Sequence, residues 1–232
     1  MAAHRSLNCT LTKQRSNYFY TYVFGVNAAL FNIRTRGLNS ALFFGMQMLG
    51  AVIFGLLVDS RPDKHSVFAR GRRGFLFVAA SMTFAWAVGI YLQYGYRGGY
   101  DTTSQVKIDF TEAAYAFPCL VFCAYGWSDS IIQTFAYWLM SVIARDDAST
   151  AGRYAGYYKG VQSVGAAVAW LLDSSYVGMA PKAQLWVCVG LFVVGMALSW
   201  PVVAGLRHDA HDEPKVGHKA SRDSDAQPAV QV

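Results

Sequence analysis

The chain has few charged residues. Only 15% of its 232 residues are Asp, Glu, Lys or Arg, whereas 54% are hydrophobic. Soluble domains carry about 25% charged residues, so this deficit argues against a soluble globular domain and indicates an integral membrane protein. No basic patch is interleaved with base-stacking aromatic residues, so the net charge of +6 does not indicate a nucleic-acid partner.

Cysteine is also scarce, and the residues needed for catalysis or metal binding are not grouped. Three of the four cysteines lie in apolar runs, where a thiol behaves as a small hydrophobic group. A structural zinc site needs four ligands at defined spacing, and the apolar runs contain no such set. They also contain no Ser/His/Asp set for nucleophilic catalysis. We therefore expect no metal, no cofactor and no enzymatic activity.

Long apolar runs dominate the chain instead. A membrane-spanning helix needs about 20 mostly apolar residues, and six segments approach this length. We predict an all-α membrane protein, with a cytoplasmic lead-in (1–16), a six-helix transmembrane domain (17–206) and a disordered cytoplasmic tail (207–232). The predicted helices are 17–33, 38–58, 74–94, one within 113–144, one within 153–172, and 184–204.

The basic residues predict the orientation of these helices. Most of the 20 Lys and Arg residues fall in the connections on the same side as the N-terminus. Because cytoplasmic loops are enriched in Lys and Arg, both termini of this multi-pass protein should be cytoplasmic. Arg34 and Arg36 are exceptions, since we expect them in a tight turn on the outer side. The sequence does not indicate which membrane holds the protein.

Polar residues inside the apolar segments are the candidates for a solute or ion path. Asp129, Gln133 and Tyr137 are spaced four apart and share one helical face. A charge at the bilayer centre costs about 2.5–3.5 kcal/mol, so an acid there needs compensation. Asp129 either binds a cation or proton, or is a structural acid that is hydrogen-bonded to a neighbouring helix. The other candidates are Asn27, Gln47 and Gln162.

The distribution of these polar residues also has a pattern. The first, second, fourth and fifth segments carry them at mid-depth, whereas the third and sixth do not. The first set should therefore face a polar interior, and the third and sixth helices should face lipid. Two three-helix units of opposite orientation would produce this pattern, as in the inverted repeats of many transporters.

The predicted fifth helix carries a lysine and a row of glycines. Lys159 lies about 9 Å along the helix from Arg153, so it could reach the inner interface as an anchor. Small residues four apart let helices approach closely, and we expect a helix-packing role for Gly152, Gly156 and Gly160.

A short motif and two longer stretches of the sequence resemble a known family. The pattern GxxxD followed by RGRR is similar to the cytoplasmic loop motif of the major facilitator superfamily. It is formed here by Gly55, Asp59, Gly71, Arg72 and Arg73, although eleven residues separate Asp59 from Gly71 where the family core has two. The stretches 31–60 and 128–173 resemble the Unc-ninety-three-like branch of that superfamily.

The resemblance implies the C-terminal half of a twelve-helix transporter. In that fold the first and fourth helices of each half line the cavity, the second and fifth flank it, and the third and sixth lie outside. The implied function is movement of a small solute or ion by alternating access. The implied partners are the lipid bilayer and a missing N-terminal half or a second copy. The alternatives are a non-transporting regulatory subunit of an ion channel and an inactive truncated fragment.

Overall fold

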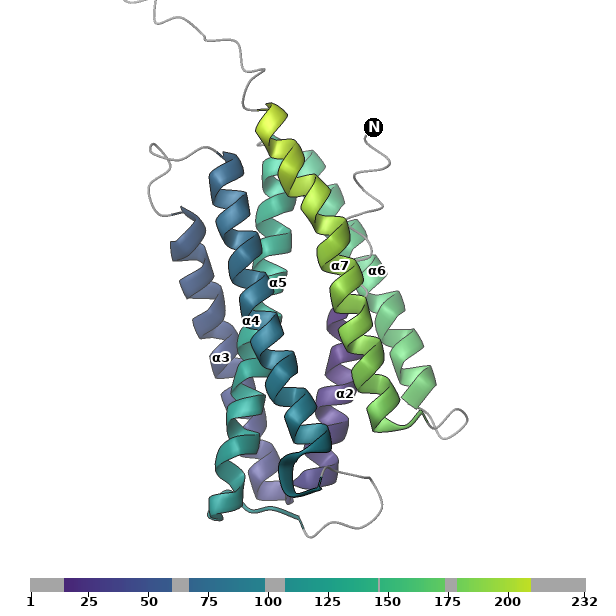
Figure 1. Cartoon of the computed structure of the whole chain (residues 1–232). Coiled ribbons are helices and arrows are strands. Elements are labelled where there is room, and N and C mark those ends of the chain that lie inside the picture. The colour runs from purple at the N-terminus through teal and green to yellow at the C-terminus, as the bar shows by residue number, and fades with distance from the viewer. Residues whose placement is uncertain (1–14, 60–66, 99–106, 146, 174–178, 210–232) are drawn as a thin grey trace, which may run out of the picture.

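In the part of the chain that the structure describes, six long helices run side by side (Figure 1). The computed structural model describes residues 15–59, 67–98, 107–145, 147–173 and 179–209. Within them the long helices are α2 (Arg15–Leu30), α3 (Ile33–Asp59), α4 (Val67–Tyr94), α5 (Ala116–Ala144), α6 (Ala148–Asp173) and α7 (Pro181–Asp209). Two short 3-10 turns, η2 (Tyr96–Gly98) and η3 (Ala113–Tyr115), complete the set. The all-α prediction is confirmed for these residues.

Three of the helices have the length and hydropathy of membrane spans among the described residues. They are α4 and most of α3 and α7, whose apolar windows reach mean hydropathies of 1.9 to 2.2. The remaining three are α5 and α6, whose apolar runs are interrupted by polar side chains, and α2, which has only 16 residues. The structure thus supports three of the expected spans, and the total of six stays a prediction.

The connection between α2 and α3 is shorter than the sequence pattern predicts. The amide of Thr35 donates to Oδ1 of Asn32 at 2.9 Å, so Asn32 caps the helix that begins at Ile33. Arg34 and Arg36 therefore lie at the start of α3, and their placement in a tight turn was wrong.

Helices α4 and α6 begin five or more residues earlier than predicted. Helix α4 starts at Val67, seven residues before the predicted start, and α6 starts five residues before its predicted segment. At α6, the carboxylate of Asp147 accepts hydrogen bonds from the hydroxyl of Thr150 and from the amides of Ser149 and Thr150. These bonds, the Thr150 hydroxyl first, hold the pKa of the exposed Asp147 below its ordinary value. The hydropathy criterion missed both starts because Arg70, Arg72 and Arg73 near the start of α4, and Ser149 and Thr150 at the start of α6, lower the hydropathy there.

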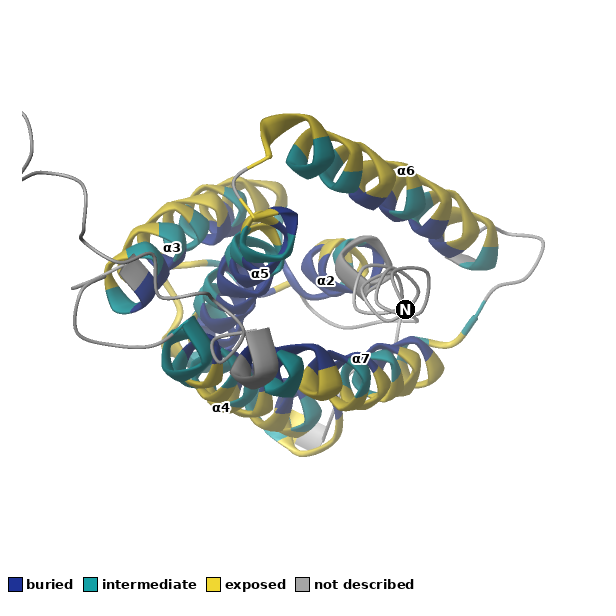
Figure 2. Cartoon of the chain, turned by 90° about the horizontal axis from the view of Figure 1, so that it is seen from above, coloured by how far each residue is buried: buried dark blue, intermediate teal, exposed yellow. Residues whose placement is uncertain are grey.

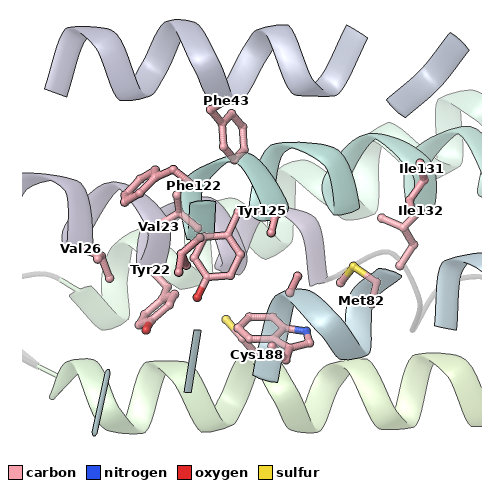
Figure 3. Packing of buried hydrophobic residues seen from close by; sticks show 14 of the residues in the cluster. Tyr22, Val23, Val26, Phe43, Met82, Phe122, Tyr125, Ile131, Ile132 and Cys188 are labelled. Atoms are coloured by element: carbon pink, nitrogen blue, oxygen red, sulfur yellow. The ribbon is translucent and has the colours of Figure 1, made fainter. Parts of the chain in front are cut away.

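Helix α5 lies at the centre of one side of the bundle, between α3 and α4, while α2 lies between α6 and α7 (Figure 2). The buried face of α5 packs against the other helices to form one core. Figure 3 shows Tyr125 and Phe122 of α5 near Tyr22 of α2. Cys188 of α7 lies on the opposite side of this group of residues. Since α5 is 29 residues long, it extends about 43 Å, more than the roughly 30 Å hydrocarbon core.

Two glycines allow α3 and α5 to approach closely. A Cβ on Gly126 of α5 would lie 2.3 Å from the carbonyl oxygen of Phe43 on α3. A Cβ on Gly50 of α3 would lie 3.0 Å from the carbonyl oxygen of Trp127 on α5. The contact is therefore reciprocal: each helix brings a residue without a side chain against the other's backbone. This contact fixes the separation of the two helices that carry Gln47 and Asp129.

The chain before α5 is fastened to the α2–α3 connection. Ile108 pairs with Phe31 in a parallel β-bridge, and its amide donates to the carbonyl of Leu30 at 2.9 Å. The amide of Phe110 donates to the Thr35 hydroxyl at 2.9 Å. We call residues 107–112 the clamp segment, because it joins the connection between α4 and α5 to the connection between α2 and α3 at one end of the bundle.

Most of the predicted lead-in, and residues 210–232 of the predicted tail, lie outside the described residues. Helix α7 continues to Asp209, three residues into the predicted tail.

Candidate functional site

The candidate site forms around a buried acid in the middle of α5. Asp129 lies about 20 Å from the start of the helix at Ala116 and about 22 Å from its end at Ala144. It is only 2% exposed. An acid buried at this position in a membrane helix is a candidate for function by default, because its charge is costly there.

Three neutral donors from three helices converge on the Asp129 carboxylate. The hydroxyl of Tyr20 on α2 donates to Oδ2 at 2.7 Å. The amide Nε2 of Gln47 on α3 donates to the same oxygen at 2.6 Å, and that of Gln133, one turn along α5, donates at 2.8 Å. Gln47 Nε2 also lies 2.7 Å from the Tyr20 hydroxyl. We call these four side chains the Asp129 cluster.

The packing around the cluster fixes the positions of its donors. Gly126 precedes Asp129 by three residues and Gly50 follows Gln47 by three, so the close α3–α5 contact brackets the hydrogen bond between them. On α2, the ring of Tyr20 lies edge-on to Phe43, with 5.7 Å between ring centroids. The donors are thus placed by helix packing before any ligand binds.

This arrangement suits an ionised carboxylate. An ionised acid only accepts hydrogen bonds, and charge-assisted bonds of 2.6–2.8 Å are among the stronger ones in proteins. Protonation of the carboxylate, or binding of a cation to it, would change the strength of the hydrogen bonds from the same three donors. The cluster therefore connects the charge state at Asp129 to the contacts among α2, α3 and α5.

Of the sequence-predicted site residues, the structure brings together Gln47, Asp129 and Gln133. Tyr20 was missed, because an aromatic residue in an apolar run is more often a core or interfacial residue than a ligand. Only the tertiary fold brings Tyr20 next to an acid 109 residues later in the chain.

Asn27 lies apart from this cluster. Its Oδ1 accepts a hydrogen bond from Nδ2 of Asn39 at 2.9 Å, and Oδ1 of Asn39 accepts one from the hydroxyl of Tyr115 at 2.7 Å. All three side chains are buried. They connect α2, α3 and η3 near the clamp segment, so Asn27 occupies a separate polar network.

Tyr137 and Gln162 form a third group with Lys159. The Lys159 ammonium donates to Oε1 of Gln162 at 2.8 Å, and it lies 5.8 Å from the ring centroid of Tyr137. The ammonium is also 5.5 Å from the ring of Tyr158. Lys159 thus takes part in a defined contact between α5 and α6, a role that the interfacial-anchor interpretation did not include.

The residues of the resembled loop motif do not all lie in a loop. Gly71, Arg72 and Arg73 lie in α4, because that helix begins at Val67. Gly71 is buried, and a Cβ there would lie 3.2 Å from Leu206 and 3.4 Å from Trp138. The placement of these three residues in a loop is therefore corrected. Gly55 has open space beside it, and the side chain of Asp59 lies outside the described part of the structure.

The glycines predicted to pack helices have no such contact in the described chain. Nothing lies within 4 Å of a Cβ built on Gly152, Gly156 or Gly160. The close helix contact is made instead by Gly50 and Gly126, which the spacing rule did not select. A packing role for the α6 glycines against a segment outside this structure stays a prediction.

Comparison with known proteins identifies UNC93-like membrane proteins as homologues. The chain is 42% identical over 165 residues to "UNC93-like protein 1" of Arabidopsis thaliana, covering 70% of this chain and 35% of that protein. It is 32% identical over 202 residues to "UNC93-like protein C922.05c" of Schizosaccharomyces pombe, covering 85% of this chain and 40% of that protein. It is 27% identical over 177 residues to "Uncharacterized membrane protein C6F6.04c" of the same yeast, covering 73% of this chain and 34% of that protein.

The chain thus spans roughly a third to two-fifths of the length of these curated relatives. No family model matches it, and no solved structure matches it. Apolar helices and membrane-protein homologues agree that this is an integral membrane protein.

Proposed function

We propose that this chain is one six-helix half of a transporter of the major facilitator type. It moves a small solute or ion by alternating access, and Asp129 is the group that binds a proton or a monovalent cation. All six helices cross the membrane, with both chain ends in the cytoplasm. The observation that carries the proposal is a carboxylate buried at the midpoint of α5 and held by donors from α2, α3 and α5.

The physical argument rests on what binding at Asp129 would change. Alternating access requires helices whose relative packing has two arrangements that a bound ion favours unequally. The cluster supplies such a connection, because three helices share one charged oxygen. A purely structural acid would need its charge to be constant, whereas a transport acid must gain and lose a positive partner.

A second six-helix unit completes the path. The relatives extend well beyond the matched region, so their remaining length is sufficient for such a unit. For this chain the second unit is supplied either by additional polypeptide or by a second copy. The half repeat of three plus three helices, inferred from the distribution of polar residues, belongs to this proposal.

The test measures ion movement by the reconstituted chain. The 232-residue chain is placed in liposomes that enclose a pH-sensitive dye, and a potassium diffusion potential drives proton entry. Parallel samples enclose a sodium-sensitive dye. We expect proton or sodium entry above that of protein-free liposomes, and Asp129→Asn should reduce it to the protein-free level, since the amide cannot be ionised.

The matched control is Asp109→Asn, which removes a carboxylate from the clamp segment outside the long helices. This variant should retain wild-type ion entry. Wild-type entry by Asp129→Asn would reject Asp129 as the ion site. A wild-type chain that is folded and forms dimers, yet carries neither ion, would reject transport by a pair of these chains.

A further inference from the structure

The cationic side chain of Lys159 on α6 lies against Tyr137, which is on the same stripe of α5 as Asp129 and Gln133. Tyr137 follows Asp129 by eight residues, about 12 Å along the helix, with Gln133 between them. The ring of Tyr137 packs edge-on against Tyr158 of α6, with centroids 5.2 Å apart, and Lys159 lies against both rings. Two groups of opposite charge therefore lie along one line of polar side chains.

The position of Lys159 argues against simple exposure to lipid. It lies about 16 Å from the start of α6 at Ala148 and about 21 Å from the end at Asp173. Its side chain is exposed in the described structure. In a helix that crosses the bilayer, a charge at this depth faces protein or a water-filled cavity, because lipid exposure is costly.

In the part of the chain that the structure describes, the ammonium of Lys159 contacts neutral groups. Its hydrogen-bond partner is the neutral amide oxygen of Gln162, which is 7% exposed, and its ring contacts are with two tyrosines. An ammonium has three donors, and only one of them is used by Gln162. The neighbouring Gly156 and Gly160 have nothing within 4 Å of their Cβ positions, so ligand atoms can approach the α6 backbone beside the lysine.

We propose that Lys159 and Tyr137 bind a small organic anion. The ammonium pairs with its carboxylate, the exposed ring of Tyr137 contacts its apolar body, and the buried Tyr158 and Gln162 hold the ammonium in place. This inference rests on the proposed function and adds to it the substrate class: an organic carboxylate that moves together with the proton or cation bound at Asp129.

The test uses benzoate, which combines a carboxylate with an apolar ring. Equilibrium binding of radiolabelled benzoate is measured on the full chain in nanodiscs of phosphatidylcholine, so that no anionic lipid competes. We expect saturable binding that Lys159→Gln weakens about tenfold or more, since a hydrogen bond to a charged group is lost. Lys159→Arg keeps the charge and should bind within a few-fold of wild type. Benzyl alcohol, which has the ring without the charge, should not displace benzoate.

A further control uses Asp109→Asn, which changes a carboxylate in the clamp segment, outside both the Asp129 cluster and the Lys159 group. It should leave benzoate binding in nanodiscs intact. Circular dichroism and thermal unfolding confirm that Lys159→Gln is folded.

The outcomes are then distinct. Absence of saturable benzoate binding by the wild type, or equal binding by wild type and a folded Lys159→Gln, overturns the carboxylate subsite even if Asp129 proves essential for ion movement. Loss of binding in Lys159→Gln, together with unchanged ion movement in Asp129→Asn, supports the subsite while rejecting the role of Asp129. Displacement of benzoate by phosphatidylglycerol but not by free acetate would also overturn the proposal, since the site would then bind lipid headgroups.

Discussion

The α3–α5 contact and the exposed face of α6 both contain glycine and a charged residue, yet they are organised in opposite ways. At the α3–α5 contact, Gly50 and Gly126 press against backbone, and Asp129 is buried among donors. On α6, Gly156 and its neighbours face open space, and Lys159 is exposed. The groups at the α3–α5 contact pack against one another within the chain. The groups on α6 are exposed and can contact another molecule.

This difference shows what glycine spacing can and cannot indicate. The regular row on α6 satisfied the small-residue rule, but no helix among the described residues packs against it. Gly50 and Gly126 lie on different helices, so no spacing within one segment relates them. Close packing depends on the two helix surfaces that meet. The spacing of small residues along one helix describes only one of these surfaces.

The largest expected effect comes from filling the α3–α5 contact. Gly126→Ala places a Cβ 2.3 Å from the Phe43 carbonyl oxygen, and backbone cannot move aside as a flexible side chain can. We expect a loss of stability of about 3 kcal/mol, at the upper end for overpacked sites. Thermal unfolding in detergent, followed by tryptophan fluorescence, measures it.

The matched control is Gly156→Ala on α6, where the added methyl meets nothing within 4 Å. It should be neutral or gain about 0.5–1 kcal/mol, because alanine loses less conformational entropy in a helix. Equal destabilisation by both changes would contradict the distinction between the two regions.

A smaller effect is expected from removing one donor of the Asp129 cluster. Tyr20→Phe keeps the ring against Phe43 but deletes the hydroxyl that donates to Asp129 at 2.7 Å. We expect a loss of about 1.5–3 kcal/mol, the range for a hydrogen bond to a charged group, with the two glutamine donors still present. The same unfolding assay measures it. Tyr154→Phe on α6, which is not part of the cluster, should unfold like wild type.

The smallest effect concerns the clamp segment and its dependence on pH. The side chain of Asn32 donates to Asp109, and this bond, followed by the amide of Thr111, lowers the pKa of Asp109. Because the folded pKa lies below the unfolded one, the stabilisation is present above the ordinary aspartate pKa of about 4 and is lost as pH falls through the lowered folded value. The clamp segment should therefore loosen in acid.

Hydrogen exchange of residues 107–112, corrected for the intrinsic pH dependence of exchange, tests this expectation. In Asp109→Asn the protection should no longer change between neutral and acidic pH. An identical acid response in wild type and variant would show that another group controls the clamp segment.

The sequence predicted much of the fold because long apolar runs have few structural alternatives. The helices were identified by length, and the boundary errors fell where capping or basic residues begin a helix, as at Asn32 and Asp147. The i, i+4 spacing put Asp129 and Gln133 on one face, and the structure joins them by a hydrogen bond. Tyr20 and the separate network of Asn27 were not predictable, since both depend on which helices are neighbours.

The sequence by itself determined that the chain forms apolar helices and that one of them carries an acid at its midpoint, because hydropathy and the helical repeat are local properties. The tertiary structure decided which polar groups meet that acid, which glycines pack and which stay open. Those outcomes depend on contacts between residues such as Tyr20 and Asp129, 109 positions apart. Packing in three dimensions sets such contacts, and no local pattern encodes them.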